Sequence, residues 1–383
     1  MRISAIVPLY NGEKYILETL RHLENQIYPL NEIIVVNDCS TDRSAEIVDA
    51  FIVTSELKVR HIINDCNRGV SFSRNRGIRE SVGEAILFMD ADDLAHDRLT
   101  QSHVELWGSA DSKKHWVLSH SAFQQMNEQG EVLEGVFRFK QVLPEEILGY
   151  EIVRNYVYLS GTIVDKEEIL AVGGFDENLT HCEDWDLWLR LAARGGFLYQ
   201  DEPLALIRRH HENASRTIES VAVGERKVLE KYSTSSLQEA IHKRNLTEEK
   251  NTVDFVSVMY RLERWDLGYE IILKLLETHP DSIAGYLFKG MYEVHNKDFE
   301  KAIITFHTAL ARDSNRCEIL NNLGACYLSL DKVIEAKSYL LRAFELLPNY
   351  MDVNKNLSII NGNKNESPHF TWRELRPVLL SYS

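Results

Sequence analysis

Residues 85–93 are Ala85-Ile86-Leu87-Phe88-Met89-Asp90-Ala91-Asp92-Asp93, an apolar run that ends in three carboxylates within four positions. A run of this length predicts one buried strand and is too short to span a membrane. Carboxylates at the carboxyl end of such a strand stand where open α/β sheets bind ligands, and closely spaced oxygen ligands suit Mg²⁺ or Mn²⁺ carrying a phosphate substrate. A helix N-cap before a helix over Leu94–Leu106 is the alternative at this point.

Length and composition predict a globular protein of about two domains. The chain has 383 residues, of which 44% are hydrophobic and 9% aromatic. Its net charge is −15, with most of the acidic excess in residues 1–250. We therefore expect no nucleic-acid surface there, because phosphate backbones are bound by clustered Lys and Arg, and an anionic substrate would need a cation as partner.

The cysteines and the N-terminus indicate a cytoplasmic protein. The five cysteines are odd in number and form no C-x-x-C pair, so neither a disulfide framework nor a structural zinc site is expected. The first residues enter a strand pattern without a signal-peptide apolar region, and no apolar segment reaches the length of a membrane span. We expect a soluble protein without a transmembrane segment, and peripheral association with the inner face of a membrane stays open.

Strands alternate with helices over the first ninety residues, which predicts a mostly parallel sheet with right-handed crossovers. Ligand groups should gather at the carboxyl ends of the strands, at Asp38, at Asp65 or Asn67, and at Asp90 with Asp92. The expected strands are Ile3–Leu9, Glu32–Val36, Lys58–Ile63 and Glu84–Met89, with helices near 15–23, 45–51 and 70–79 between them and less regular strands at Trp116–Ser119, Val132–Phe139 and Tyr158–Val164.

A second group of carboxylates lies at the start of a predicted helix. Apolar residues at helical spacing begin at Trp185, and Gly195-Gly196 ends the helix. Thr180 and Glu183 have the spacing of a capping box, which gives Glu183 a structural explanation. Asp184 has none so obvious, and in the first helical turn the macrodipole favours its ionised form.

Four segments follow the predicted strands in order: Ile6-Val7-Pro8-Leu9-Tyr10-Asn11-Gly12, Val36-Asn37-Asp38-Cys39-Ser40-Thr41-Asp42, Asn67-Arg68-Gly69-Val70-Ser71-Phe72-Ser73-Arg74-Asn75-Arg76-Gly77 and Phe88-Met89-Asp90-Ala91-Asp92-Asp93. Their order resembles the inverting glycosyltransferases of family 2. The resemblance covers roughly residues 1–222 and implies a GT-A fold, an α/β Rossmann-like mixed sheet with flanking helices. Cys39 stands where the family often has Gly, which could alter the adjoining loop, and Ser73 stands where Ala usually precedes Arg-Asn.

The resemblance implies roles for the residues at the donor side. Asp38 would hydrogen-bond the nucleobase or ribose, the backbone of Pro8–Tyr10 would line the nucleoside pocket, and Asn67 would belong to the same donor site. The alternative for Asp38 is a cap of the helix over Thr41–Phe51, where Asp42 also competes. Arg74 would meet the nucleotide, against the alternative of an exposed helical Arg paired with Glu.

The same resemblance implies a metal site and a catalytic base. Asp92 would ligate Mn²⁺ or Mg²⁺, Asp90 would contact ribose and metal-bound water, and Asp93 is interpreted as a cap. Asp184 would remove the proton of an acceptor hydroxyl, with Glu183 beside it. His210 would ligate the metal and Arg209 would neutralise leaving-group charge, in a segment that continues to Ser215. The tryptophans at 185 and 188 are interpreted as core, with a sugar platform as the alternative for Trp185.

The second half of the chain repeats with a period of 34 residues, which is the period of the tetratricopeptide repeat. Pro280, Ser314 and Pro348 show it, as do Gly290 with Gly324. We expect three repeats, about 249–282, 283–316 and 317–350, and a cap from Asp352. The predicted division is a catalytic domain over 1–222, a helical connector over 223–250, an all-α repeat domain over 251–360, and a tail over 361–383 that packs on the repeats, on a partner or on a membrane surface.

The resulting hypothesis is a metal-dependent inverting transferase that moves a sugar from a nucleotide diphosphate, with UDP favoured, to a hydroxyl of a glycan, a lipid-linked glycan or a protein. The repeats would bind a peptide, form a homodimer or buttress the catalytic domain. Two other functions stay open, a non-catalytic nucleotide-binding adaptor and a nucleotidyltransferase. The second shares the metal-diphosphate chemistry but does not need Glu183 and Asp184.

Overall fold

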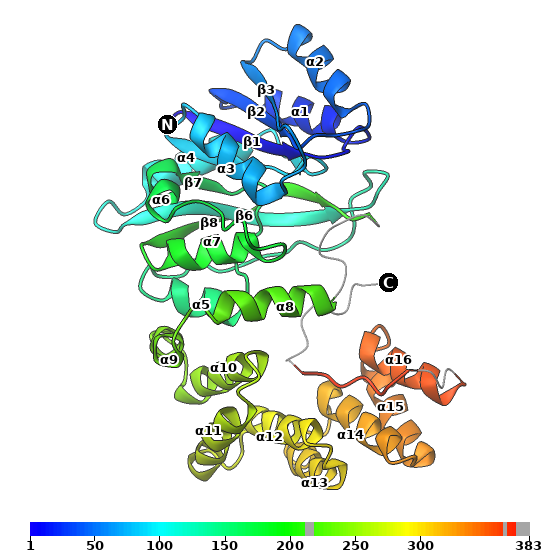
Figure 1. Cartoon of the computed structure of the whole chain (residues 1–383). Helices are drawn as coiled ribbons and strands as arrows, with labels where there is room; N and C mark the ends of the chain where they lie inside the picture. The colour runs from blue at the N-terminus through cyan, green and yellow to red at the C-terminus, as the bar shows by residue number, and fades with distance from the viewer. Residues whose placement is uncertain (211–217, 363–365, 373–383) are drawn as a thin grey trace. The chain divides into compact units, whose positions relative to one another are not determined.

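The computed structural model describes residues 1–210, 218–362 and 366–372. It divides into two compact units, Met1–Asn245 and Leu246–Ser383 (Figure 1). The first unit combines a sheet with helices, and the second is helical.

The described part of the first unit contains a mixed eight-stranded sheet of order β3-β2-β1-β4-β7-β6-β8-β5. The first four strands of this order run parallel, β7 pairs antiparallel with β4 and β6, and β8 runs parallel to β6. The strands are β1 Ile3–Leu9, β2 Glu32–Asn37, β3 Val59–Ile63, β4 Ala85–Phe88, β5 Leu94–Ala95, β6 Trp116–Met126, β7 Ile163–Asp165 and β8 Gly196–Arg208. The helices are α1 Ile16–Glu24, α2 Ser44–Thr54, α3 Val70–Glu80, α4 Leu99–Ser109, α5 Ile147–Val153, α6 Lys166–Ala171, α7 Glu183–Ala192, α8 Ile218–Leu229 and α9 Thr234–His242.

The sheet has an apolar core on each face. Alternate residues of β1 point to opposite faces, so Val7 packs with residues of α1 and α2, whereas Ile6 belongs to the core formed with α3 and α7. Gly77 of α3 lies against Ile6, since a Cβ at this position would be 2.6 Å from Ile6 Cγ2. The close approach of α3 to β1 fixes the side chains that α3 carries toward the carboxyl end of the sheet.

The structure corrects several of the expected elements. Leu94–Leu106 is not one helix, because Leu94 and Ala95 pair with β8 as β5 and the helix begins at Leu99. Residues 132–139 pair with β6 only through two isolated bridges, and of residues 158–164 only the last two belong to a strand, β7. The sequence also gave no indication of β8, whose interior includes Asp201, Glu202 and Pro203.

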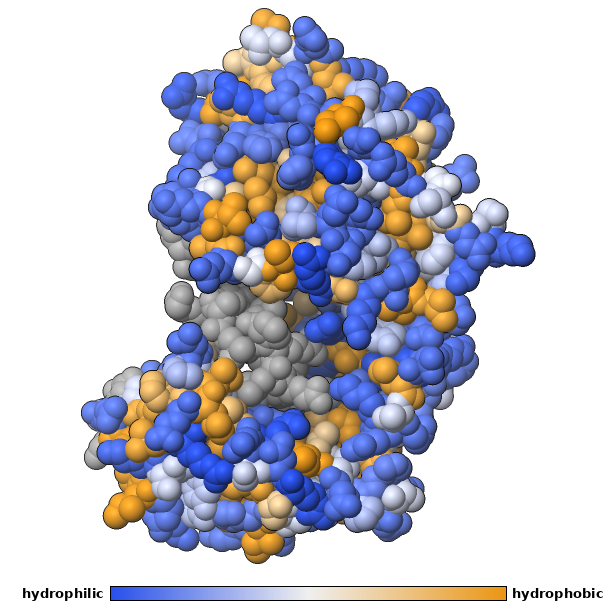
Figure 2. Space-filling model, turned by 180° about the vertical axis from the view of Figure 1, so that it is seen from behind, coloured by the Kyte–Doolittle hydropathy of each residue, from blue (hydrophilic) through white to orange (hydrophobic). Residues whose placement is uncertain are grey.

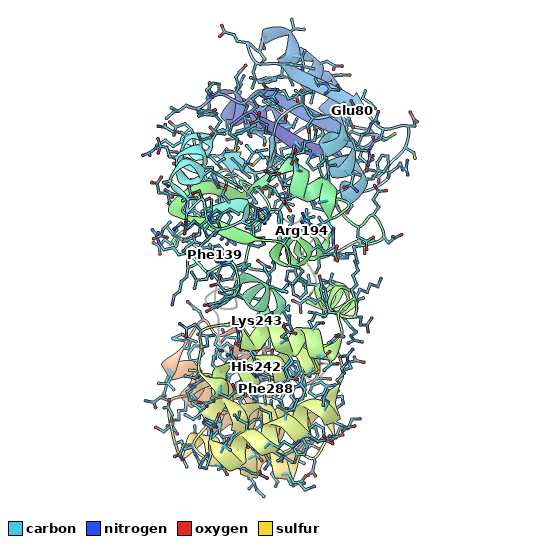
Figure 3. All side chains as sticks on the ribbon, turned by 90° about the vertical axis from the view of Figure 1, so that its left-hand side faces the viewer. Glu80, Phe139, Arg194, His242, Lys243 and Phe288 are labelled. Carbon is cyan, nitrogen blue, oxygen red and sulfur yellow. The ribbon has the colours of Figure 1, made fainter. Side chains whose placement is uncertain are left out.

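The second unit consists of consecutive antiparallel helices with a shared apolar core. Gly290 and Gly324 each lie against a residue of the following helix, where a Cβ would come within 2.3 Å of Phe306 and 2.5 Å of Leu340. Phe288, labelled in Figure 3, is among the buried side chains of this core. The helices are α10 Glu248–Arg261, α11 Trp265–Thr278, α12 Ile283–His295, α13 Phe299–Leu310, α14 Cys317–Ser329, α15 Val333–Leu346 and α16 Met351–Ile360.

The surface of the first unit is mixed in character. On the face that Figure 2 displays, hydrophobic residues form several small groups that are separated by hydrophilic residues. Among the residues that the structure describes, no helix combines the length and the apolar character needed to cross a membrane.

Candidate active site

The loop after β4 carries the three carboxylates of residues 90–93 and is held in place by its main chain. Thr19 Oγ1 donates to the carbonyl oxygens of Ala91 and Asp93, and the Asp90 amide donates to Ser160. Asp93 is not a helix cap. Its buried carboxylate accepts from the Arg208 amide at 2.8 Å, and burial, then the charges of Asp92 and Asp90, raises its pKa well above the usual value.

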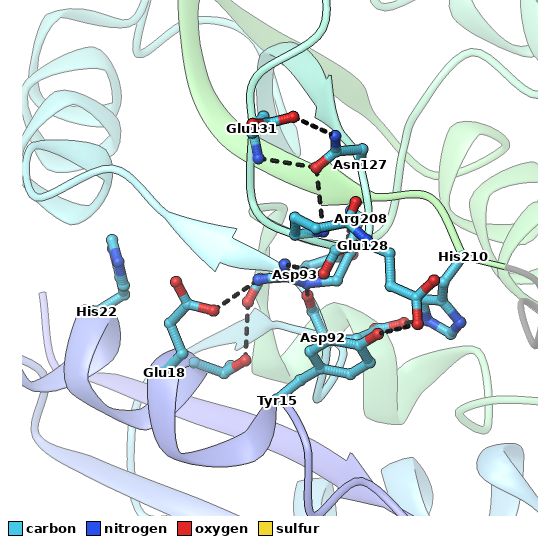
Figure 4. Close-up of polar contacts among 12 residues, drawn as sticks. Tyr15, Glu18, His22, Asp92, Asp93, Asn127, Glu128, Glu131, Arg208 and His210 are labelled. Atoms are coloured by element: carbon cyan, nitrogen blue, oxygen red, sulfur yellow. Dashed lines mark hydrogen bonds and ion pairs between the residues drawn. The ribbon is translucent and has the colours of Figure 1, made fainter.

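Asp92 and His210 come together although 118 positions separate them. Asp92 Oδ2 lies 2.7 Å from His210 Nε2, and the His210 ring stacks on Tyr15 with centroids 5.3 Å apart (Figure 4). Loss of water around Asp92 and the charge of Asp90 raise the Asp92 pKa, an effect that the His210 contact opposes. A cation in this place would relieve the repulsion between the two carboxylates.

Arg208 supports the same loop and was not predicted from the sequence. Its Nε donates to the Asp92 carbonyl oxygen at 2.9 Å, and its Nη2 to Glu18 at 2.6 Å (Figure 4). The guanidinium also lies over the Tyr15 ring, 4.7 Å from the centroid. Arg208 therefore ties the end of β8, two residues before His210, to the loop at Asp92 and Asp93. No strand was predicted there, so no sequence signal pointed to Arg208.

Arg74 joins the two groups of carboxylates. Its Nη2 donates to Asp90 Oδ1 and its Nη1 to Glu183 Oε1, each at 2.8 Å. The alternative was an exposed helical Arg paired with Glu. Arg74 does pair with a Glu, but it is buried, with only 4% of its surface exposed. The guanidinium faces the Phe175 ring, 5.3 Å away, so a buried cation connects the loop after β4 with the start of α7.

The predicted capping box at α7 is also wrong. The residue before the helix is Cys182, in a left-handed conformation with φ 61°, and its side chain makes no capping hydrogen bond. Glu183 is the first helical residue and directs its carboxylate to Arg74 instead of back to the chain. Thr180 lies two positions before Cys182 and is too far from the helix to act as its N-cap.

Asp184 accepts a hydrogen bond from Asn155 Nδ2 at 3.0 Å. Removal from water and the neighbouring charge of Glu183 raise the pKa of Asp184 to about 6. The helix dipole favours the ionised form, as predicted, but the loss of water around the carboxylate outweighs this effect on its pKa. A carboxylate in this pKa range is ionised at neutral pH and more basic than an ordinary aspartate.

Trp185 and Trp188 belong to the core. Trp185 is 2% exposed and donates from Nε1 to the Glu151 carbonyl oxygen at 2.7 Å, and Trp188 is fully buried. The alternative of Trp185 as a sugar platform is wrong for this structure, because its ring is not accessible.

Asp38 is buried at the carboxyl end of β2 and holds the loop before α3. Its carboxylate accepts from the amides of Arg68 and Gly69, the latter at 2.7 Å, and from Asn64 Nδ2 at 2.7 Å. It does not cap α2, whereas Asp42 does accept from the Ser44 amide at 3.0 Å. Asn64 had not been singled out, although it is the first polar residue after β3.

The two departures from the family pattern have structural counterparts. Ser73 accepts a hydrogen bond from Asn64 Nδ2 at 3.0 Å, so its hydroxyl joins the Asp38 network. Cys39 adopts φ 63°, the left-handed conformation that glycine takes without strain.

The side chains of the remaining predicted site residues are not part of the hydrogen-bond networks described above. Pro8 is in β1, and Tyr10 just after it is 52% exposed. Asn67 is exposed in the loop before α3. Arg209 extends the pairing of β8 with β6 by donating its amide to the Met126 carbonyl oxygen at 2.8 Å. Residues 211–215 of the predicted segment lie outside the described residues.

The described side chains could supply some, but not all, of the ligands that a divalent cation requires. Within the described ranges, no three His, Cys, Asp or Glu side chains are grouped as a protein-only metal site would require. Asp92 and His210 offer an oxygen and an imidazole nitrogen at one point, next to Asp90. Mg²⁺ and similar ions are commonly held by one or two protein side chains with substrate phosphates and water as further ligands.

Comparisons with known proteins show the family to which the chain belongs. Residues 4–114 match the family model described as glycosyl transferase family 2. The chain is similar to the amylovoran biosynthesis glycosyltransferase AmsB of Erwinia amylovora, with 32% identity over 212 residues, which cover 53% of this chain and 68% of that protein. The chain belongs to glycosyl transferase family 2.

Two further comparisons set the extent of the similarity. An uncharacterized glycosyltransferase of Rickettsia felis is 28% identical over 210 residues, which are 54% of this chain and 33% of that protein. The chain thus spans about a third of the length of the first curated relatives it matches. The crystal structure of Staphylococcus aureus TarS 1–349 in complex with UDP-GlcNAc superposes with a TM-score of 0.51 at 20% identity, covers 92% of this chain and 93% of that one, and shows the shared fold.

Proposed function

We propose that this chain is a metal-dependent inverting glycosyltransferase that takes a sugar from a nucleotide diphosphate, UDP being the favoured nucleotide. The observation that carries the proposal is the position of Arg74, whose guanidinium binds Asp90 of the donor loop and Glu183 at the start of α7. This contact joins a carboxylate loop suited to a metal-diphosphate with a carboxylate pair suited to acceptor activation. The UDP-GlcNAc of the similar TarS structure supports the choice of UDP.

In this proposal Asp184 is the base. Its ionised carboxylate would take the proton of the acceptor hydroxyl as the oxygen attacks the anomeric carbon from the face opposite the diphosphate. Asn155 orients the carboxylate, and Glu183 together with the loss of water raises its basicity. Glu183 itself is engaged with Arg74, so it is a positioning residue and not a second base.

Asp92 and His210 would hold a Mn²⁺ or Mg²⁺ ion, which supplies positive charge to the diphosphate leaving group. The stacking of His210 on Tyr15 and the contact of Arg208 with the Asp92 carbonyl oxygen keep these two side chains facing each other. Arg209 is the further cation that we assign to the leaving group.

The donor nucleoside would lie at the carboxyl ends of β1 and β2, near Pro8 and Tyr10. Asp38 already accepts from two amides and from Asn64, so we assign it to shaping this pocket through the loop at Asn67–Gly69. A direct contact of Asp38 with the nucleobase would have to share or replace one of these hydrogen bonds.

We also propose that the helix pairs of the second unit are tetratricopeptide repeats. The pairs α12–α13 and α14–α15 begin 34 residues apart, and glycines 290 and 324 occupy equivalent close contacts. The acceptor hydroxyl would belong to a glycan, a lipid-linked glycan or a protein, and a repeat domain adds a surface for a protein partner or a second copy.

A donor panel tests the proposal. The full chain is incubated with Mn²⁺ and a series of UDP-, GDP- and dTDP-sugars, and nucleotide release is measured with and without EDTA. We expect slow release of UDP from one or a few UDP-sugars that EDTA suppresses. Nucleotide binding by calorimetry without release from any donor, even with candidate acceptors present, would instead support the adaptor.

A further inference from the structure

Residues 366–372 form an extended segment that runs beside α14 and α16 in the second unit (Figure 1). The proposed transferase activity gives this segment no role. Its sequence is Glu-Ser-Pro-His-Phe-Thr-Trp, and its contacts with the helices involve both its main chain and its side chains.

Two asparagines bind the main chain of the segment in the same way. Asn356 donates to the His369 carbonyl oxygen at 2.8 Å and accepts from the His369 amide at 2.7 Å. Asn322 donates to the Thr371 carbonyl oxygen at 3.0 Å and accepts from the Thr371 amide at 2.7 Å. Each side-chain amide therefore pairs with one residue as a neighbouring strand would, and the two residues bound are two positions apart, on one side of an extended chain.

The spacing of the asparagines matches the repeat. Asn322 and Asn356 are 34 positions apart and occupy equivalent places on α14 and α16. One step of the repeat thus corresponds to a two-residue step of the bound segment. Because both contacts use only main-chain atoms, they place no demand on the sequence that is bound.

Selectivity comes from a pocket for the Thr371 hydroxyl. Thr371 Oγ1 accepts from Asn321 Nδ2 at 3.1 Å, donates to Asp352 Oδ2 at 3.0 Å, and contacts the Tyr350 hydroxyl. One donor and two acceptor sites are all that a hydroxyl offers, so its hydrogen-bonding capacity is filled. Thr371 is only 2% exposed, and a methyl group in place of the hydroxyl would leave the buried Asn321 and Tyr350 and the half-buried Asp352 without this partner.

Aromatic rings flank the threonine. Phe370 stacks parallel to Phe299 with centroids 6.4 Å apart, and Trp372 meets Trp265 edge-on at 5.4 Å. Trp265 is itself stacked on His295 at 4.0 Å. The segment is therefore recognised as an aromatic-Thr-aromatic sequence held through its backbone.

We propose that this groove, lined by Asn321, Asn322, Tyr350, Asp352 and Asn356, is a binding site for an extended aromatic-Thr-aromatic segment of a protein partner, and that residues 369–372 are its intramolecular occupant. An interface formed only to cap the last helix would need apolar contact alone. Buried amides that bind the main chain are how proteins read an extended peptide, and a partner's segment offers the same atoms. Residues 369–372 and the partner's segment would therefore compete for one site.

The test uses a labelled peptide with the sequence of residues 366–372 and a matched peptide with Val in place of Thr. The protein is the full chain as wild type and as the variants Thr371→Val and Thr371→Ser. Thr371→Val weakens the hold on the chain's own segment, whereas Thr371→Ser keeps the hydroxyl. We expect the Thr peptide to bind Thr371→Val at least tenfold more tightly than wild type or Thr371→Ser, because a tethered occupant competes at a high effective concentration. The Val peptide should bind at least tenfold more weakly than the Thr peptide.

A measurement on the wild-type chain keeps the proposal testable if Thr371→Val misfolds. The amides of His369 and Thr371, which donate to Asn356 and Asn322, should be protected from hydrogen exchange and should lose protection when excess Thr peptide is added. Equal binding of both peptides, or protection that excess peptide leaves unchanged, would overturn the proposal. A concentration-dependent dimer of Thr371→Ser or wild type that excess Thr peptide dissociates would show that the segment of a second copy is the occupant, and would overturn the proposal as well.

Discussion

Asp184 differs from an ordinary first-turn carboxylate because two effects on its pKa oppose each other. The start of α7 and Asn155 favour the anion, while loss of water and Glu183 disfavour it, and the sum raises the pKa to about 6. The hydrogen bond from Arg74 holds the Glu183 carboxylate in place beside it. The site therefore holds a basic carboxylate, a buried cation and a carboxylate loop within a connected set of contacts.

The pKa of Asp184 predicts the acid limb of the pH profile. A base must be ionised, so kcat/KM should be constant near neutral pH and should fall about tenfold per unit below pH about 6, where Asp184 becomes protonated. The hydrogen bond from Asn155 favours the anion, so Asn155→Ala should move this limb to higher pH. A profile of initial rates between pH 5 and 8 checks both, and an Asn155→Ala limb at lower pH would contradict the assignment.

Arg74→Met should destabilise the first unit. The change leaves Asp90 and Glu183 facing each other without their shared cation, and removing one partner of a buried ion pair costs about 3 kcal/mol or more. Adding Glu183→Gln should recover part of the loss in free energy of unfolding, because one uncompensated charge is removed. Urea unfolding followed by circular dichroism measures both, and equal stability of Arg74→Met and wild type would refute the bridging role.

Cys39→Gly should stabilise the protein by up to about 1 kcal/mol, because glycine adopts the φ of 63° without the strain that a Cβ brings. Cys39→Ala is the matched control, since it removes the thiol but keeps the Cβ, and it should leave the free energy of unfolding nearly unchanged. A gain from alanine equal to that from glycine would attribute the effect to the thiol.

At the scale of elements, the parallel half of the sheet was predictable because each strand is a buried apolar run followed by a polar loop. β1 has the predicted bounds, β2 and β3 each differ from prediction by one residue at one end, and β4 is one residue shorter than predicted at both ends. The antiparallel half was not predictable in the same way. β5 is two residues long and exists only through its pairing with β8, whose charged interior conceals the strand pattern.

In the candidate site, too, contacts between segments far apart in the sequence were only partly predictable. Asp92 with His210 could be proposed from sequence order, and the structure places them 2.7 Å apart. The contacts of Arg74 with Glu183 and of Asn155 with Asp184 could not, because they join segments that local patterns do not relate. The capping-box spacing of Thr180 and Glu183 was misleading, since Cys182 in a left-handed conformation is the residue that precedes the helix.

Because α3 packs closely on β1, one added methyl group at the contact should lower the free energy of unfolding markedly. Gly77→Ala places a Cβ 2.6 Å from Ile6 Cγ2 and should cost about 1–3 kcal/mol despite the better helix propensity of alanine. Gly108→Ala is the matched control, because a Cβ there meets nothing within 4 Å and should stabilise α4 by up to about 1 kcal/mol. Thermal unfolding distinguishes the two, and stabilisation by both changes would contradict the tight packing of α3.

At the scale of the whole molecule, the chain joins an α/β unit of glycosyl transferase family 2 to a helical unit that binds its own last described segment. The family was predictable from four short segments because each follows a strand whose end lies at the ligand-binding edge. The binding of residues 369–372 to the helical unit was not predictable from the sequence. The 34-residue spacing of Asn322 and Asn356 indicates a peptide-binding role only once the structure shows that they bind His369 and Thr371.

The most direct test of the account compares wild type with Asp184→Asn in two measurements on the same preparations. These are sugar transfer from the UDP-sugar that the donor panel identifies, and binding of UDP in the presence of Mn²⁺. Removal of the base while Asn155 and Arg74 remain should lower transfer by about 10²–10⁴-fold and leave UDP affinity within about twofold. Wild-type transfer rates in Asp184→Asn would contradict the central claim that this carboxylate activates the acceptor.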